Sequence, residues 1–191
     1  MANVGLIVHL GRDKASAHAR DLAEWLSAEG HTVRMPPDDA DVSGLADHEV
    51  AASDFGAGLD LCVTLGGDGS ILRAVELLGD APVPILGVDH GQLGYLTEVE
   101  PGDAQSAVAR ALAGDHALYE RMLIEITIIA GDEVQSHRAL NEAVIERSAD
   151  ANTIRLAVDV DDEFFTSYAA DGLIVATPTG WRRTRPELRD L

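Results

Sequence analysis

The sequence predicts an α/β domain with a mostly parallel sheet, followed by an antiparallel β domain. Up to about residue 115, apolar strand-like runs alternate with segments of helical periodicity, which is typical of a parallel sheet covered by helices. From about Leu118, short β-branched segments separated by turn residues follow one another, as they do in antiparallel sheets. The 191 residues, 46% of them hydrophobic, suffice for one fair-sized core or two small ones.

The first elements are a strand, a helix and a second strand. Residues 4–10, VGLIVHL, form an apolar run typical of a buried strand. Apolar residues then recur at helical spacing over 15–26, and Gly30 supplies a stop. Residues 31–35, HTVRM, predict the next strand. Residues 36–58 are polar and interrupted by Pro and Gly, which favours a long surface connection.

Two further strands and two helices complete the first domain. Residues 59–65, LDLCVTL, predict a strand, and residues 70–78, SILRAVELL, predict a helix. Residues 82–88, PVPILGV, predict another strand. Residues 103–114, DAQSAVARALAG, predict a helix with Asp103 as its N-cap.

The second domain is predicted as a series of short strands. Hairpin turns are expected at AGDE, residues 130–133, and at DVDDE, residues 159–163. The strands are expected over residues 122–129, 137–147, 153–160, 163–170 and 173–178. A cleft between two domains is the usual place for a ligand, so we expect one there.

Charge and cysteine content exclude several classes of function. The formal net charge of −19 argues against nucleic acid or an anionic membrane as a partner, because both require a basic surface. Cys62 is the only cysteine, which excludes an intrachain disulfide and a multi-thiolate metal site and favours a reducing, cytoplasmic setting. The apolar N-terminal stretch is too short for a signal peptide or a membrane span. The seven histidines lack metal-ligand spacing, so we expect them on the surface or in loops, with His18 on a helix.

A glycine-rich loop, GGDGS at residues 66–70, joins a buried strand to a helix. Such loops usually receive phosphate, because backbone N–H groups and the positive helix end meet there. Ser70 is expected to cap the helix, and Arg73 lies one turn inside it. A carboxylate at this point suits a neighbouring cation or a reacting hydroxyl. The alternative is a plain tight turn in which Asp68 bonds its own backbone.

Four blocks in this order resemble the family of NAD kinases. The blocks are GGDGS, GVDHGQLGYLTE, LNEAVIERS and DGLIVATPTG, which cover the chain from about Leu61 to Gly180. The resemblance implies a fold related to NAD kinases and diacylglycerol kinases. It implies transfer of a phosphoryl group from ATP, or from polyphosphate, to the 2′-hydroxyl of the adenosine ribose of NAD. Mg²⁺ or another divalent cation would assist.

The resemblance also implies roles for individual residues. Asp68 corresponds to the catalytic base of the family. The positions that would bind the NAD cofactor are Asp68, Gly69, Arg73, Asn141, Glu142, Asn152, Asp171 and Thr179. Relatives often carry a basic residue where this chain has Asn152. Without the resemblance, the Asn141–Glu142 step would be interpreted as a polar kink at a strand edge and Asp171 as part of a hairpin turn in AADGL.

The resemblance divides the chain into residues 1–115, a nucleotide-binding domain, residues 116–180, a partial β domain that binds NAD, and residues 181–191, an atypical basic tail. After TPTG the family continues with a Ser-Thr-Ala-Tyr block and further strands, whereas this chain reads WRRTRPELRDL. We therefore expect an incomplete antiparallel β domain and a homo-oligomer. Two alternatives remain open: an inactive relative that binds nucleotide without turnover, and a lipid or sugar kinase with the same glycine loop.

Overall fold

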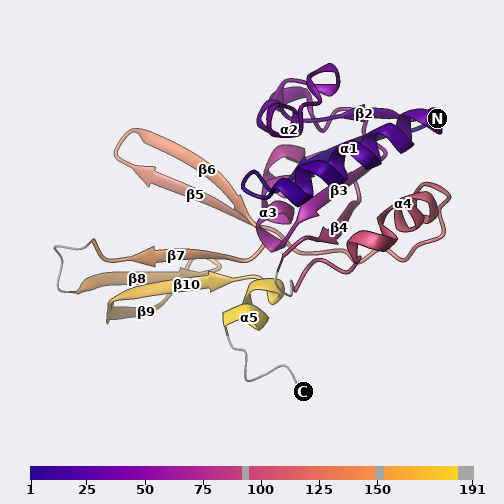
Figure 1. The fold of residues 1–191 in the computed structure, drawn as a ribbon. Coiled ribbons are helices and arrows are strands. Elements are labelled where there is room, and N and C mark those ends of the chain that lie inside the picture. Colours follow the sequence, from indigo (N-terminus) through magenta and orange to yellow (C-terminus); the bar gives the residue numbers. More distant parts are fainter. Residues whose placement is uncertain (92–94, 149–152, 185–191) are drawn as a thin grey trace. The chain divides into compact units, whose positions relative to one another are not determined.

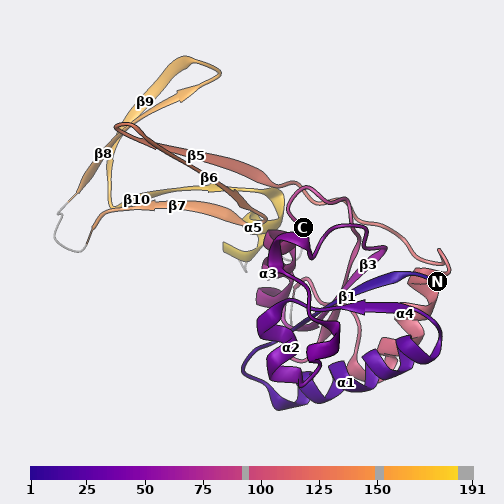
Figure 2. The same cartoon turned by 90° about the horizontal axis from the view of Figure 1, so that it is seen from above.

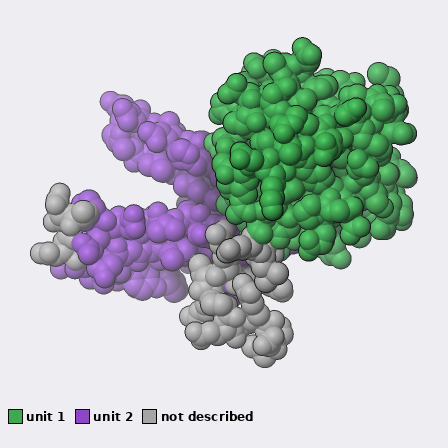
Figure 3. All heavy atoms as spheres, in the orientation of Figure 1, with its two compact units in different colours: residues 1–119 green, residues 120–191 purple. Residues whose placement is uncertain are grey.

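The structure is a computed structural model that describes residues 1–91, 95–148 and 153–184. It divides into two compact units, Met1–Tyr119 and Glu120–Leu191 (Figure 3). Each unit is described by itself below.

Unit 1 is built on a four-stranded parallel sheet (Figure 1). Its strands lie in the order β2-β1-β3-β4, with β1 and β3 in the centre. The strands are β1 (Asn3–Val8), β2 (Thr32–Arg34), β3 (Leu61–Gly66) and β4 (Ile85–Asp89). The predicted parallel α/β architecture is confirmed.

Helices pack on both faces of this sheet. One face carries α1 (Asp13–Ala28) and α4 (Ala104–Leu112), whose buried residues join one cluster with alternate residues of β1 and β3. The other face carries α3 (Asp68–Leu78), which packs on Ile7 and Cys62. The central strands contribute to both clusters because successive side chains of a strand point to opposite faces of the sheet.

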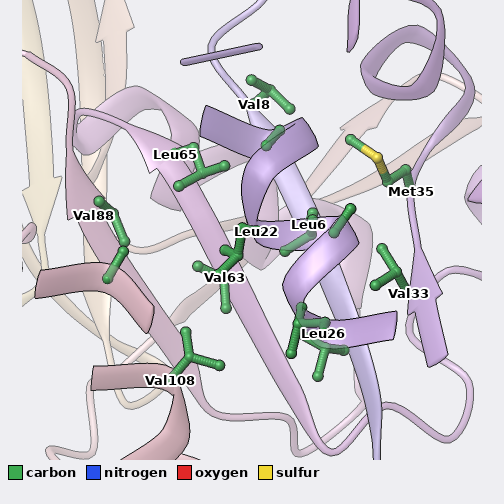
Figure 4. Close-up of a cluster of buried hydrophobic side chains, with 14 of the residues drawn as sticks. Leu6, Val8, Leu22, Leu26, Val33, Met35, Val63, Leu65, Val88 and Val108 are labelled. Atoms are coloured by element: carbon green, nitrogen blue, oxygen red, sulfur yellow. The ribbon is translucent and has the colours of Figure 1, made fainter. Parts of the chain in front are cut away.

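The larger core lies between α1 and the sheet. Figure 4 shows Leu22 and Leu26 of α1 directed toward Leu6 and Val63 of the two central strands. These side chains are essentially inaccessible to solvent. The helical spacing of apolar residues that the sequence displays is therefore the contact face of α1.

Residues 36–58 are not the simple surface connection that the sequence predicts. They include the helix α2 (Pro37–Ser43) and two 3₁₀ turns, η1 (Ala46–His48) and η2 (Ala52–Asp54). Pro37 occupies the first turn, where a missing N–H costs nothing, and Gly44 ends the helix with a φ of 66°. Phe55 is fully buried in the second core cluster. Contacts with the rest of unit 1 therefore bury part of this segment, although its own composition is polar.

Of the two expected caps, the one at Asp103 is confirmed in position and the one at Ser70 is wrong. Asp103 closes the 3₁₀ turn η3 (Pro101–Asp103) and occupies the cap position of α4, but its side chain makes no capping hydrogen bond. Gly67 rather than Ser70 is the N-cap residue of α3, and Ser70 is buried inside the first turn.

The described residues of unit 2 form three two-stranded antiparallel ladders and one short helix (Figure 2). The predicted hairpins β5–β6 and β8–β9 are confirmed, with turns at Gly131 and at Asp161–Asp162, all of which have positive φ. The third ladder pairs β7 with β10. The elements are β5 (Ile124–Ala130), β6 (Glu133–Ala139), β7 (Glu142–Glu146), β8 (Ile154–Val160), β9 (Glu163–Ala170), β10 (Gly172–Ala176) and α5 (Pro178–Thr184).

The reading of AADGL as a hairpin turn is wrong. Asp171 lies between β9 and β10, and these strands pair with β8 and β7 rather than with each other. Asp171 is thus a corner at which the chain passes from one ladder to another.

Burial differs sharply between the units. Among the described residues, Leu140 is the only buried hydrophobic residue outside unit 1. No helix in the described part of the chain is long and apolar enough to cross a lipid bilayer.

Candidate functional site

The glycine-rich loop lies at the point where the strand order of the sheet reverses. From β1 the chain passes through α1 to β2, and from β3 it passes through α3 to β4, so the two connections leave neighbouring strands in opposite directions. Ligands of open α/β sheets bind at the carboxyl ends of the strands at such a point. Residues 66–70 lie there, from the last residue of β3 into the first turn of α3.

The glycines of this loop serve different purposes. A Cβ on Gly66 would overlap the Ser70 side chain and lie 3.3 Å from the Cβ of His9, so this position packs against the first turn of α3. A Cβ on Gly67 or Gly69 would meet no atom of the described residues within 4 Å. The backbone at these two positions therefore faces open space, as a loop that receives a ligand requires.

Asp68 is the first residue of α3 and links it to the segment after β4. One carboxylate oxygen accepts the N–H of Leu96 at 2.9 Å, and the other accepts the N–H of Tyr95 at 3.3 Å. The negative charge also lies favourably at the start of a helix. Each oxygen has a second lone pair, so the carboxylate keeps acceptor capacity for a ligand hydroxyl.

Arg73 is bound within unit 1 by a partner that the sequence analysis missed. Its guanidinium donates to the carbonyl of Val8 at 3.1 Å and forms an ion pair with Asp39 of α2. The other Asp39 oxygen accepts the N–H of Val8 at 2.6 Å. The carboxyl end of β1 is thereby joined to both α2 and α3. Burial raises the pKa of Asp39, while Val8 N–H and Arg73 act in the opposite direction.

A pair of imidazoles lies at the same end of the sheet. Nδ1 of His18, on α1, and Nε2 of His90, just after β4, are 2.8 Å apart, within hydrogen-bond distance. The backbone of His90 donates to the carbonyl of Gly66 at 2.9 Å and accepts a hydrogen bond from Arg12. The expectation of His90 as a plain loop residue is too simple, and its partner is 72 residues away in the chain, so no local pattern could reveal it.

Burial is the main influence on both imidazoles. It lowers the pKa of His18, against the attraction of Asp21. It also lowers the pKa of His90, where His18 and Arg12 act in the same direction and Asp89 opposes them. The hydrogen bond between the rings requires at least one neutral imidazole.

In unit 2, the Asn141–Glu142 step lies at the start of β7 beside α5. Asn141 is buried, and its carbonyl accepts the N–H of Thr177 at 2.8 Å. The Oε2 atom of Glu142 is buried and has no hydrogen-bond partner among the described residues. A buried polar atom without a partner is costly and requires an explanation, and a bound ligand hydroxyl is one.

The remaining predicted residues lie in different places. Thr179 is buried in the first turn of α5, on the same side of unit 2 as Glu142. Asp171 is exposed at the opposite end of the β7–β10 ladder, with its Oδ1 3.4 Å from Nε of Arg147. Four residue steps separate the two ends, or about 14 Å. Asn152 lies outside the described residues.

Apart from Asp171 and Asn152, the structure therefore gathers the predicted residues into two groups. Asp68, Gly69 and Arg73 belong to α3 in unit 1, whereas Asn141, Glu142 and Thr179 surround the start of β7 in unit 2. No group of three or more His, Cys, Asp or Glu side chains arranged for a metal ion occurs in the described ranges.

Two family descriptions match the chain. That of the ATP-NAD kinase N-terminal domain matches residues 4–116, and that of the ATP-NAD kinase C-terminal domain matches residues 140–182. The first match contains the glycine-rich loop, and the second contains the Asn141–Glu142 step.

Curated proteins named NAD kinase are similar to this chain over most of its length. The NAD kinase of Citrifermentans bemidjiense is 37% identical over 184 residues, and that of Heliobacterium modesticaldum is 38% identical over 185 residues. Each alignment covers 94% of this chain and 64% of the relative. The chain thus spans slightly less than two thirds of the length of these relatives.

Solved structures share the fold. A yeast NADH kinase complexed with NADH is similar with a TM-score of 0.85 and 24% identity, over 94% of this chain and 58% of that one. An NAD kinase from Archaeoglobus fulgidus in complex with ATP gives a TM-score of 0.64 and 23% identity, over 93% of this chain and 61% of that one.

Proposed function

Because the chain belongs to the ATP-NAD kinase family, we propose that it transfers a phosphoryl group from ATP to the 2′-hydroxyl of the adenosine ribose of NAD. One observation carries the proposal. The two family domains match in the expected order, the first over the glycine-rich loop and the second over the Asn141–Glu142 step.

Unit 1 would hold the phosphoryl donor and supply the base. The open backbone at Gly67 and Gly69, at the start of α3, supports binding of phosphate oxygens. The Asp68 carboxylate would accept the proton of the 2′-hydroxyl. The hydroxyl oxygen would at the same time form a bond to the γ-phosphorus of ATP, and ADP would leave. Arg73 would act near this site, and its ion pair with Asp39 supports a role through orientation of α3.

Unit 2 would hold NAD. Oε2 of Glu142, which has no partner in the described part of the chain, supports a hydrogen bond from a ribose hydroxyl, and the Asn141 amide is suited to an adenine edge. Thr179, in the first turn of α5, would contribute its hydroxyl. Asp171 and Asn152 would contact other parts of the dinucleotide.

A divalent cation such as Mg²⁺ would neutralise charge on the donor. Mg²⁺ is usually held by one or two carboxylates together with substrate phosphates. The lack of a three-ligand cluster among the described residues is compatible with that arrangement. Asp68 and Asp89, at the carboxyl ends of β3 and β4, are carboxylates of the type it requires. Inorganic polyphosphate would suit the same loop, because it presents the same chain of phosphate groups.

We also propose self-association through unit 2. Large apolar side chains are exposed on its strands, among them Ile129, Phe164 and Phe165. Exposed apolar surface of this kind favours association with another protein surface.

An assay of NADP formation tests the proposed function. The 191-residue chain is incubated with NAD, Mg²⁺ and either ATP or polyphosphate, and NADP is measured with an NADP-specific dehydrogenase. We expect NADP with at least one donor and none when NAD is omitted. Binding of NAD without any NADP would contradict the proposal and favour a non-catalytic relative.

A further inference from the structure

We propose that Thr177 is a positioning residue that fixes the Asn141–Glu142 step for its ligand. The inference rests on the proposed function, because it concerns the residues that would hold NAD. It adds a residue that makes no ligand contact of its own and acts through the start of β7.

Thr177 forms hydrogen bonds to the first residue of the step and to the residue before it. Its N–H donates to the carbonyl of Asn141 at 2.8 Å, and its hydroxyl donates to the carbonyl of Leu140 at 2.5 Å. The hydroxyl also accepts the N–H of Gly180 at 3.1 Å, as an N-cap side chain does. Thr177 is 1% exposed, so water cannot replace these bonds. One hydroxyl thus joins the chain before β7 to the first turn of α5.

The first turn of α5 also lies close to the Glu142 side chain. A Cβ on Gly180 would overlap the Asn141 carbonyl and lie 2.7 Å from Oε2 of Glu142. Gly180 therefore allows an approach that no other residue permits without movement. Oε2 of Glu142 is buried there and has no hydrogen-bond partner in the described ranges.

These contacts together hold in one place a carboxylate whose Oε2 atom lacks a partner among the residues that the structure describes. Keeping a polar group desolvated costs free energy, and the surrounding structure must oppose its escape to water. Thr177 supplies that restraint, because its hydroxyl donates one hydrogen bond and accepts another. A Ser hydroxyl can do both, whereas Val has no hydroxyl. A preorganised site binds its ligand more tightly than one that must order on binding.

The test compares Thr177→Val with Thr177→Ser in the full chain. Val keeps the shape and removes the hydroxyl, whereas Ser keeps the hydroxyl. We expect Thr177→Val to weaken NAD binding about tenfold or more by calorimetry, with the KM for ATP unchanged and the KM for NAD raised. Thr177→Ser is expected to stay close to the parent protein. Thr127→Val, on the exposed face of β5, is the matched control.

A second readout needs no ligand. Hydrogen exchange at the amides of Gly180 and of residues 142–143 is expected to quicken in Thr177→Val and to be restored in Thr177→Ser. Unchanged exchange in Thr177→Val overturns the inference, even if the chain proves inactive. Unchanged NAD affinity in Thr177→Val, in a chain that binds NAD, also overturns it, while the proposed function stands.

If Thr177→Val fails to fold, Gly180→Ala takes its place. The added methyl group would displace the Asn141 carbonyl and the Glu142 side chain and leave the Thr177 hydroxyl in the chain. Full NAD affinity in that variant would show that the first turn of α5 does not position Glu142.

Discussion

Asp68 has to meet two demands with one carboxylate. It accepts hydrogen bonds from the N–H groups of Tyr95 and Leu96, and in the proposed reaction it also accepts a proton. An amide side chain retains one acceptor oxygen for the backbone but cannot take the proton. The two demands can therefore be separated by substitution.

We expect Asp68→Asn to lower kcat by about 10² to 10⁴-fold, the usual effect of a positioned general base, with little change in NAD affinity. Steady-state kinetics and calorimetry measure the two quantities. Glu76→Gln, at an exposed position on the same helix, is the control. Near-normal turnover of Asp68→Asn would leave Asp68 as an anchor for the segment after β4.

Glu142 differs from Asp68 because one of its oxygens has no partner in the described structure. We expect Glu142→Ala to weaken NAD binding by about 1.5–3 kcal/mol, or roughly tenfold or more, because a charged hydrogen bond to ribose would be lost. Calorimetry compares it with Glu146→Ala at the other, exposed end of β7. Equal affinity in both variants would make Glu142 a structural residue of the strand edge.

The His18–His90 pair predicts a dependence of stability on pH. Burial lowers both pKa values from 6.5, so the unfolded chain takes up protons first as the pH falls below about 6.5. The stability of unit 1 that depends on these two histidines should therefore be complete above that pH. The free energy of unfolding should decrease as the pH falls toward roughly 5.

Urea denaturation followed by the fluorescence of Trp25, in a Trp181→Phe background, measures this effect. The double variant His18→Gln and His90→Gln should show a flatter dependence over the same range. His137→Gln, on exposed β6, should retain the slope of the parent protein. A parent protein equally stable at both ends of the range would contradict the prediction.

At the scale of elements, periodic segments were predictable and the short α2 was not. The apolar spacing along α1 and the unbroken run in β3 report burial directly, and the structure confirms both. In α2, the buried residues include Asp39. A carboxylate is buried only with partners, and its partners, Arg73 and Val8, lie 34 and 31 residues away. A single sequence contains no signal for such a pair.

The same argument applies to the site. The glycine-rich loop and the Asn141–Glu142 step are continuous motifs, so their positions could be predicted from the sequence. The contacts of Thr177 with Leu140 and of His18 with His90 join distant segments and appear only in three dimensions.

Asp39 joins three elements, and its removal should be costly. We expect Asp39→Ala to reduce the free energy of unfolding by about 3–5 kcal/mol, because it leaves the half-buried Arg73 charge and the Val8 N–H without their partner. Thermal and urea denaturation measure the change. Asp38→Ala, one residue earlier and exposed, should change it by less than about 0.5 kcal/mol. Equal effects would mean that the ion pair contributes little.

At the scale of the whole molecule, the sequence predicted the change from a parallel α/β unit to antiparallel strands, because the hydrophobic period itself changes. It did not predict which strands pair: β10 pairs with β7 across two intervening strands. Pairing depends on register and on long-range contacts, which local patterns do not encode.

The uneven burial predicts that unit 1 is the stable part of the chain. Both core clusters draw their residues from between Val4 and Leu112, whereas the described strands of unit 2 are largely exposed. Since buried apolar area is the main favourable term in folding, we expect a fragment of residues 1–119 to fold alone with a cooperative thermal transition. In the full chain, amides of β5 to β10 should exchange faster than those of β1 and β3. Calorimetry of the fragment and hydrogen exchange of the full chain measure both quantities. An unfolded fragment, or β1 amides that exchange as fast as those of β9, would mean that unit 1 depends on unit 2 for its stability.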